Sequence, residues 1–494
     1  MCDNYTGEAL ELCNSMSTDL NNFFTLWATS MVFFMHAGFA MLSAGAVRTK
    51  STTNILICVV MDCCACAFAW WLMGWALAYG EDRGSFIGGS QFAGDELGES
   101  VGYIDWLFQF AFAATSATIV SGAVAERATF ESYLTYSFYL SAVIYPVVVH
   151  WVWGGGFLTL NNDGFTVGGV GALDFAGCGP VHMVGGVAGA VGSYLIGPRL
   201  GRFDSDGKPL AMPGHSTPLA TLGTFILWVG WLGFNPGSVL SLVGNSNIAA
   251  RAAVNTILCS ATGGLSSLFF ATAINPGREW DINGALNGVL AGLVSITAGC
   301  PVVSPWASLV IGVFGGVVYQ CASKFVLLVM KLDDPLDAVA VHAFTGAWGL
   351  IAVGFFAKTE FVQELAGFDE SVAYQDYSGV FYGGNGILLG CQLVEIVCIV
   401  PWVTALIFPY FFVLRKLNFL RISAQAEEIG IDNSSHGGHA YPDFFPDVSR
   451  STYSNQNGSV HSVHSSYANP PKEKAKNDPT DDNNNDNNAA LAQA

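Results

Sequence analysis

The chain has 494 residues, of which 52% are hydrophobic and only 12% are charged. Soluble domains carry about 25% charged residues, so this composition excludes an ordinary soluble protein and indicates a membrane protein. The formal net charge is −19. The sequence carries no basic stripe that could neutralise phosphates, which argues against nucleic acid as a partner.

Eleven stretches are apolar and long enough to cross the core of a lipid bilayer, which takes about 20 residues. We expect membrane-spanning helices over 23–44, 55–79, 103–124, 133–153, 179–197, 217–239, 252–273, 285–301, 304–330, 337–356 and 384–413. The residues before the first stretch are polar and acidic and do not resemble a cleavable signal peptide. The fold class is therefore an all-α, multi-pass membrane protein.

The basic residues that flank these stretches predict their orientation. Of the 19 Lys and Arg residues, Arg83, Arg251 and Lys358 fall on one side of the membrane and the others on the opposite side. Because basic residues concentrate in cytoplasmic loops, we expect the N-terminus outside and the C-terminus inside.

The composition divides the chain into four parts. We expect an extracellular segment over 1–22, a membrane domain over 23–415, a cytoplasmic regulatory segment over 416–445 that docks on the membrane domain, and a disordered low-complexity tail over 446–494.

The extracellular segment holds two features of its own. Asn4 begins a candidate glycosylation sequon. Cys2 and Cys13 are the two cysteines in a polar setting, and their spacing leaves open a disulfide within the chain or a bridge between subunits. The other cysteines fall almost all in apolar runs and read as core residues.

A short pattern occurs twice in the chain. Asp174 precedes His182 by eight residues, Asp334 precedes His342 by eight residues, and each His is followed by two glycines at matching distances. By the topology above, the two segments enter the membrane from opposite sides. Two inverted five-helix repeats followed by an eleventh helix would explain this arrangement, with function at the interface of the repeats.

Ionisable residues inside a membrane are costly, so each is a candidate for function. If the repeat brings His182 and His342 together, two neutral imidazoles can share a hydrogen bond and offer a relay for protons. Asp174 can cap a helix, hold negative potential beneath a cation site, or do both. Aromatic rings such as Trp153 and Phe112 can replace part of a cation's hydration.

These residues stand in a pattern that resembles the ammonium transporter family, most closely its plant and algal type 1 branch. The matching segments are Ala125-Glu126-Arg127, Trp153 to Gly156, Asp174 to Gly177, Val181 to Gly186, Gly233 to Ser238, Asn287 to Val294 and Asp333 to His342. The family comprises multi-pass membrane proteins that form trimers with one substrate pathway through each protomer. The resemblance therefore implies a homotrimer.

The resemblance also implies roles for individual residues. Phe112, Trp153 and Ser238 look like the family's external ammonium site, and Asp174 looks like the carboxylate that supports it. Phe112 also pairs with Phe234 as the gate below that site.

Further inward, His182 and His342 look like the paired pore histidines that relay protons. Ser434 stands where the plant branch has a Thr in its regulatory tail, which implies a phosphorylation site and a kinase as partner. No cofactor and no metal are expected.

Three functions follow from this reading. The first is an electrogenic ammonium transporter of the plasma membrane that recruits NH4+, deprotonates it and conducts NH3 while the proton travels separately. The second is an ammonium sensor that signals through the C-terminal tail, and the third is an electroneutral ammonia channel. An enzyme is not expected, because no nucleophile elbow or phosphate loop is present.

Overall fold

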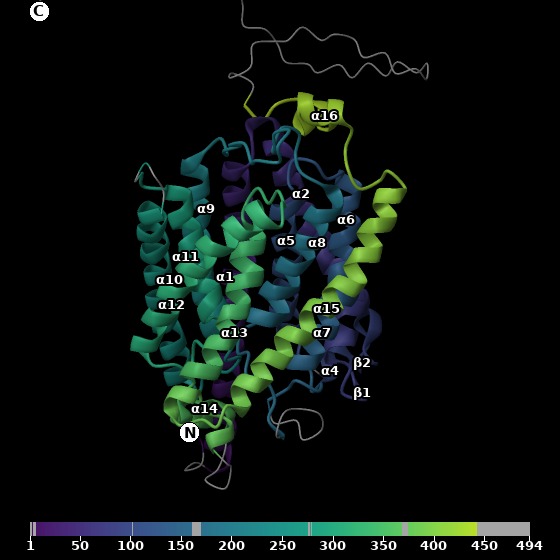
Figure 1. Cartoon of the computed structure of the whole chain (residues 1–494). Helices are drawn as coiled ribbons and strands as arrows, with labels where there is room; N and C mark the ends of the chain where they lie inside the picture. Colours follow the sequence, from purple (N-terminus) through teal and green to yellow (C-terminus); the bar gives the residue numbers. More distant parts are fainter. Residues whose placement is uncertain are drawn as a thin grey trace, which may run out of the picture. The chain divides into compact units, whose positions relative to one another are not determined.

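The computed structural model describes residues 2, 6–100, 102–160, 169–274, 277, 279–367 and 374–441. Long apolar helices run side by side through this part of the chain (Figure 1). Ten helical segments among the described residues are long and apolar enough to cross a membrane, and a shorter apolar helix lies among them. The protein is therefore a multi-pass membrane protein.

The ten candidate spans and the shorter apolar helix of the described residues follow one another along the chain, with π-helical turns within them marked η. They are α1 (Glu8–Ala46), α2–η2–α3 (Thr52–Ala69, Trp70–Gly74, Trp75–Tyr79), α5 (Tyr103–Val124), α6–η4–α7 (Phe130–Tyr139, Leu140–Ile144, Tyr145–Val152), η6–α8 (Cys178–Met183, Val184–Ile196), α9 (Thr217–Gly237), α10 (Ser246–Ile274), the shorter α11 (Ile282–Ile296), α12–η7 (Pro305–Lys324, Phe325–Val329), η8–α13 (Val339–Phe344, Thr345–Phe356) and α15 (Ile387–Lys416).

Shorter elements connect the spanning helices. They are α4 (Leu97–Ser100), α14 (Thr359–Ala366), α16 (Ala424–Ile429), α17 (Ile431–Ser435), the antiparallel strands β1 (Asp82–Arg83) and β2 (Ile87–Gly88), and the 3-10 turns η1 (Thr49–Ser51), η3 (Phe92–Gly94), η9 (Tyr374–Asp376) and η10 (Val380–Tyr382).

Each expected stretch overlaps one of these helices, and three of them differ by five residues or more at one end: α1, α10, which begins at Ser246 rather than at 252, and α11. Helix α1 begins at Glu8 rather than near residue 23, because neither Gly nor Pro interrupts residues 8–37. Helix α11 ends at Ile296, five residues before the expected end, where the chain turns toward Pro301 and Pro305. Hydrophobicity alone marks what can enter a membrane, whereas these ends are set by turns and helix propensity.

Small residues let several helices approach closely. A Cβ atom added to Gly312 of α12 would lie 2.2 Å from the carbonyl oxygen of Cys259 in α10, and one added to Gly316 would lie 2.4 Å from that of Gly263. Any larger side chain would push the two backbones apart. The glycine ridge of α12 therefore packs against α10, as four-residue spacing of small residues predicts.

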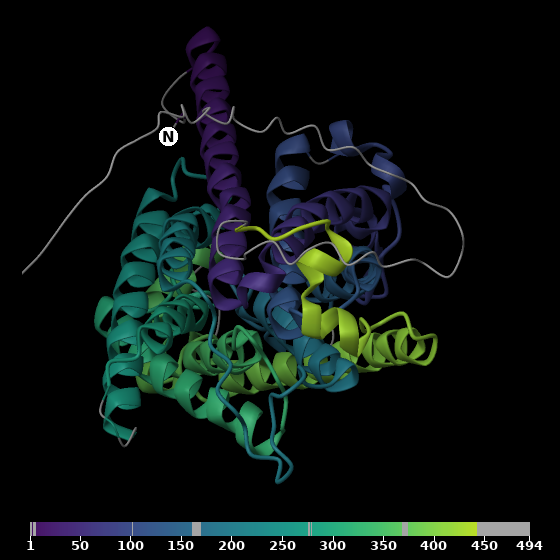
Figure 2. The ribbon, with the colours of Figure 1, turned by 90° about the horizontal axis from the view of Figure 1, so that it is seen from above.

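The helices gather in two groups when they are seen from above (Figure 2). The purple-to-blue helices of the first half lie on one side, the teal-to-green helices of the second half on the other, and α1 lies between them. Helix α15 runs obliquely across the outside of the bundle (Figure 1). It exposes apolar side chains such as Val397 and Val413, as a helix in contact with lipid does.

The segment after α15 folds back onto the end of the bundle where α1 finishes. Asp432 is fully buried there, and its carboxylate accepts hydrogen bonds of 2.8 Å from the backbone amides of Thr53 and Asn54, in the first turn of α2. Lys50 donates to the carbonyl oxygens of Glu427 and Glu428. The described part of residues 416–445 is therefore bound to the spanning helices through specific polar contacts.

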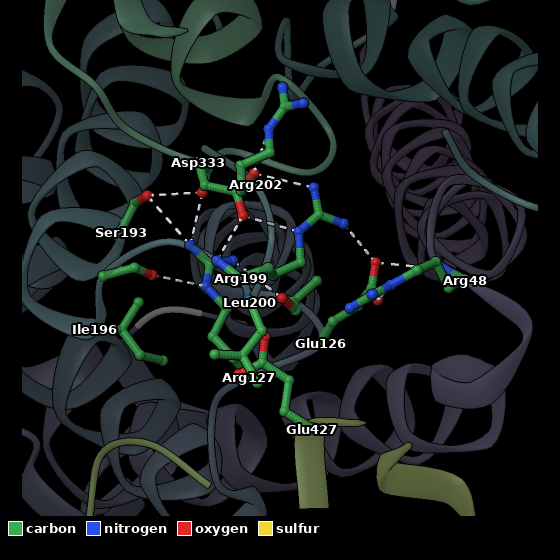
Figure 3. A network of polar contacts seen from close by, with 12 residues as sticks. Arg48, Glu126, Arg127, Ser193, Ile196, Arg199, Leu200, Arg202, Asp333 and Glu427 are labelled. Atoms are coloured by element: carbon green, nitrogen blue, oxygen red, sulfur yellow. Dashed lines mark hydrogen bonds and ion pairs between the residues drawn. The ribbon is translucent and has the colours of Figure 1, made fainter. Parts of the chain in front are cut away.

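A buried network of charges lies beneath this segment (Figure 3). Arg199 bridges two acidic side chains, with Nη1 2.5 Å from Glu126 Oε1 and Nε 2.8 Å from Asp333 Oδ2. Burial alone would raise the pKa of Asp333, but the hydrogen bonds and charge of Arg199 lower it to about 2. Glu427 joins the network by accepting from the amide of Leu200 at 2.7 Å. The network thus links two loops to the C-terminal segment.

Candidate functional site

A cavity of about 200 Å³ opens at the end of the bundle where α1 begins. Its wall contains three residues that the sequence predicted for one site, Phe112, Trp153 and Ser238. The full lining, which we call the aromatic vestibule, is Tyr79, Phe108, Gln109, Phe112, Trp153, Phe175, Ser238 and Leu240. The Phe112 and Trp153 rings meet edge to face, with centroids 6.2 Å apart.

Oxygen atoms complete the wall of this vestibule. Tyr79 Oη and Gln109 Oε1 are buried and have no hydrogen-bond partner among the described residues. Ser238 Oγ donates to the carbonyl oxygen of Phe234 at 2.8 Å, which leaves its lone pairs free to accept. Rings and oxygen acceptors together suit a small cation that donates hydrogen bonds.

Two stacked phenylalanine rings close the bottom of the vestibule. The centroids of Phe112 in α5 and Phe234 in α9 lie 4.1 Å apart at an angle of 26°. Both side chains are buried, with 1% and 0% of their surface exposed. Stacking at this distance leaves no space between the rings, so anything that passes here must move at least one of them.

The two predicted histidines lie directly beyond this stack. His182 stacks on Phe234 with centroids 5.7 Å apart, and its Nδ1 atom lies 3.2 Å from Nδ1 of His342. A hydrogen bond between them needs one imidazole to donate and the other to accept. His182 Nε2 is buried and has no partner among the described residues. The fold therefore brings together the two histidines that the repeated pattern contains.

Two further cavities continue from the histidines toward the opposite end of the bundle. The first, of about 20 Å³, is lined by His342, Thr118 and Asn287 among others. The second, of about 190 Å³, shares Asn287 and Leu336 with the first. The vestibule, the phenylalanine stack, the histidine pair and these cavities thus follow one another through the protein.

The two Asp residues of the repeat occupy equivalent places. Asp174 Oδ2 accepts from the amide of Gly179 at 2.7 Å, and Asp334 Oδ2 accepts from the amide of Val339 at 2.7 Å, five residues on in each case. Each carboxylate therefore caps the π-helical turn that carries a histidine. Burial and then the charge of Asp337 raise the pKa of Asp334 to about 7.

Asp174 is also tied to the vestibule. Its Oδ1 accepts from the amides of Gly177 and Cys178 at 2.8 and 3.0 Å, and its carbonyl oxygen accepts from Trp153 Nε1 at 2.7 Å. Burial raises the pKa of Asp174, while these amide hydrogen bonds favour the ionised form. Gly177 makes this loop feasible, because its φ is +104° and an added Cβ would lie 2.9 Å from the Trp153 ring.

Several residues at the site were not identified from the sequence. Tyr79 and Gln109 carry no motif of their own, and only folding brings them to Trp153. Phe175 lies in the matched segment Asp174 to Gly177, but the resemblance assigns no role to it. Trp231, whose ring centroid lies 5.5 Å from that of His182, is likewise an ordinary aromatic residue in an apolar run. Spacing that matched the family pattern found Phe234 and Ser238, three and seven residues after Trp231 in α9.

The remaining predicted residues lie away from the pathway. Ser434 lies in α17, where its hydroxyl reaches the carbonyl oxygen of Ile431 at 3.4 Å. Cys2 and Cys13 form a disulfide within the chain, which decides between the two alternatives left open above. Asn4 and residues 446–494 lie outside the described residues. No group of three or more metal-binding side chains is found in the part of the chain that the structure describes.

Comparison with known proteins agrees with this architecture. The model of the Ammonium Transporter Family matches residues 23–441. Ammonium transporter 1 member 3 of Solanum lycopersicum is 43% identical over 437 residues, which cover 86% of this chain and 94% of the relative. Ammonium transporter 1 member 1 of Arabidopsis thaliana is 41% identical and covers 83% of each chain.

Solved structures resemble the fold as well. A structure described as a Sensor Amt Protein is 29% identical, with a TM-score of 0.77 over 85% of this chain and 99% of its own. Candida albicans Mep2 is 27% identical, with a TM-score of 0.70 over 82% of this chain and 86% of its own. From these matches and the eleven apolar helices described above, the chain belongs to the ammonium transporter family, a family of transporters rather than enzymes.

Proposed function

We propose that this protein is an electrogenic ammonium transporter that takes ammonium up across the plasma membrane. The observation that supports this proposal best is the order of features along one pathway. An aromatic vestibule with free oxygen acceptors is followed by a closed pair of rings and then by two histidines that can share a hydrogen bond as neutral imidazoles. The first feature favours a monovalent cation and the next two disfavour charge.

Ammonium is recruited in the vestibule, where it faces the rings of Phe112 and Trp153 and donates hydrogen bonds to oxygens such as Ser238 Oγ. The carboxylate of Asp174 supports the site from below by its negative potential. Asp174 does not line the vestibule, so it acts through the loop that holds Trp153 rather than as a direct ligand.

Deprotonation gives the transporter its selectivity. To pass between the stacked rings of Phe112 and Phe234 a charged ion must give up its remaining hydration and hydrogen bonds, whereas neutral ammonia can cross at a much lower cost. One N–H bond of ammonium breaks and its electron pair stays on nitrogen. The proton travels separately through His182 and His342. Potassium has a similar charge but no proton to lose, so the barrier rejects it by chemistry rather than by size.

A voltage-clamp recording tests this proposal. Cells that express the protein should show a saturable inward current with ammonium and none with equimolar potassium, and Asp174→Ala should reduce that current strongly. Labelled methylammonium uptake without current would favour the electroneutral channel instead. The absence of both current and uptake would contradict transport altogether.

The second candidate function is an ammonium sensor, and the docked C-terminal segment favours it. Asp432 holds this segment at the first turn of α2, and Ser434 lies two residues away, where a phosphate would add about −2 charges. A structure described as a Sensor Amt Protein shares this fold.

We predict that Asp432→Asn releases this segment. The variant loses the carboxylate that accepts two amides, so residues 424–435 should exchange amide hydrogens at least about tenfold faster than in the wild type. Glu428→Gln is the matched control, because the contact of Glu428 with Lys50 uses its backbone carbonyl. Equal exchange in both variants would show that Asp432 does not hold the segment.

We also propose a membrane topology. Eleven helices cross the membrane as two inverted five-helix repeats plus α15, with the N-terminus outside. We also propose a homotrimer with one pathway in each protomer. The first part of α1 supports subunit contact, since Leu12, Met16 and Leu20 form an exposed apolar stripe at four-residue spacing.

A further inference from the structure

Glu395 is a carboxyl group on the buried face of α15, a helix whose other face is exposed. Its side chain has no exposed surface, whereas Leu393 and Val397, two residues before and after it on α15, are 45% and 67% exposed. Burying a charge within an apolar span is costly unless the charge is paired or neutralised. The surroundings of Glu395 therefore decide whether it carries a proton.

The carboxyl of Glu395 lies against the first turn of η6, because a Cβ added to Gly179 would be 2.2 Å from Glu395 Oε1. Asp174 contacts the same glycine, because its Oδ2 accepts from the amide of Gly179 at 2.7 Å, and the two carboxyl groups interact electrostatically there. Neither oxygen of Glu395 receives a hydrogen bond from a donor group in the described ranges. Two carboxyl groups thus face each other inside the protein.

Among the described residues, no basic group acts on Glu395. The titratable groups that act on Glu395, or on which it acts, are Asp174, Cys178 of η6 and Cys398 of α15, and none of them is basic. Asp174 already accepts three amide hydrogen bonds, which favour its ionised form. Two adjacent buried carboxyls cannot both ionise without a counter-charge, but one shared proton lets one donate to the other.

We propose that Asp174 and Glu395 form a carboxyl pair that holds one shared proton, with Glu395 as the neutral donor. The negative potential beneath the vestibule is then a property of the pair, which carries one charge rather than two. Glu395 is a positioning residue that acts through Asp174. The pairing itself rests on the geometry, and its effect on ammonium rests on the proposed function.

Infrared difference spectroscopy of the purified full-length protein in lipid tests the pairing without any transport. The wild type minus Glu395→Gln should show the carbonyl stretch of a protonated carboxylic acid at neutral pH, shifted in D2O. Asp62→Asn is the matched control. Asp62 is also fully buried in a span, but its carboxylate accepts from Thr118 and Cys66 rather than facing a second carboxyl.

Ammonium should shift the Glu395 band and leave the wild type minus Asp62→Asn difference spectrum unchanged. In transport, Glu395→Gln keeps a neutral donor and should change the half-saturating ammonium concentration by less than about twofold. Glu395→Leu removes the donor and should raise that concentration several-fold.

The inference would be overturned if the Glu395 band were absent and the half-saturating ammonium concentration of the Gln variant rose by about tenfold or more. Those results would mean that Glu395 is ionised. A Leu variant that does not fold leaves the spectrum of the Gln variant to decide. If the band is present but the wild type carries no ammonium, the proposed function fails and the carboxyl pair stands.

Discussion

His182→Ala should lower the ratio of ammonium to potassium current by about tenfold or more. His182 lies between the phenylalanine stack and His342, with Nδ1 3.2 Å from the partner nitrogen. Removing the imidazole leaves space that water can fill, and a water-filled passage conducts an intact cation. Ammonium would then pass with its proton, as potassium would, so the chemical basis of selectivity would be lost.

Voltage clamp with alternating ammonium and potassium solutions measures this ratio. His36→Ala is the control, since His36 is also a buried histidine in a span but contacts the carbonyl of Phe33 in its own helix. Its current ratio should match the wild type. If His182→Ala also keeps the wild-type ratio, the histidine pair does not relay protons and the mechanism proposed above is wrong in that step.

Asp333→Ala should lower the free energy of unfolding by about 3–5 kcal/mol, because it removes one of the two carboxylates that pair with the buried Arg199. The three arginines that meet Asp333 through its carboxylate or its carbonyl oxygen are Arg127, Arg199 and Arg202. The loop before η8 and the loop after α8 both depend on this one side chain (Figure 3). Thermal unfolding in detergent should therefore show a large decrease in the midpoint.

The control for this variant is Asp206→Asn. Asp206 pairs with Lys208 at 3.7 Å, but both side chains are more than 70% exposed, so the pair contributes roughly 0–1 kcal/mol. Its midpoint should stay near that of the wild type. Similar midpoints for the two variants would show that the buried network does not stabilise the fold.

The lowered pKa of Asp333 predicts how the free energy of unfolding depends on pH. The pKa of Asp333 is lowered to about 2 from an ordinary value of 3.8, so its contribution is fully present above the ordinary value. That contribution is lost as the pH falls from about 4 toward 2, where the folded carboxylate takes up its proton. Asp333→Asn should flatten this part of the stability curve measured between pH 5 and pH 2.

Much of the architecture could be predicted from hydrophobicity and spacing. The eleven apolar stretches each overlap a helix, since a segment that enters lipid must satisfy its backbone within itself. The eight-residue spacing of Asp174 and His182, repeated at Asp334 and His342, marked the two histidines as equivalent positions of a repeat. The fold then brings their Nδ1 atoms to 3.2 Å from each other.

The ends of helices and the identity of contact partners could not be predicted from hydrophobicity and spacing. Helix α1 begins at Glu8 in a polar segment that hydropathy alone excludes from a membrane span. The choice between a disulfide within the chain and one between subunits depended on where Cys2 and Cys13 lie in space. Neither the start of α1 nor the pairing of Cys2 with Cys13 follows from residue type alone.

The sequence by itself thus determined the membrane setting and the family, and it predicted candidate site residues at motif positions. Only the tertiary structure decided which groups without a motif lie beside such positions: Tyr79 and Gln109 in the vestibule, Arg199 between Glu126 and Asp333, and Glu395 beside Asp174. Glu395 follows Asp174 by more than two hundred residues, and its helix crosses the outside of the bundle. Such pairs form only because packing of the helices brings distant parts of the chain together and excludes water from between them.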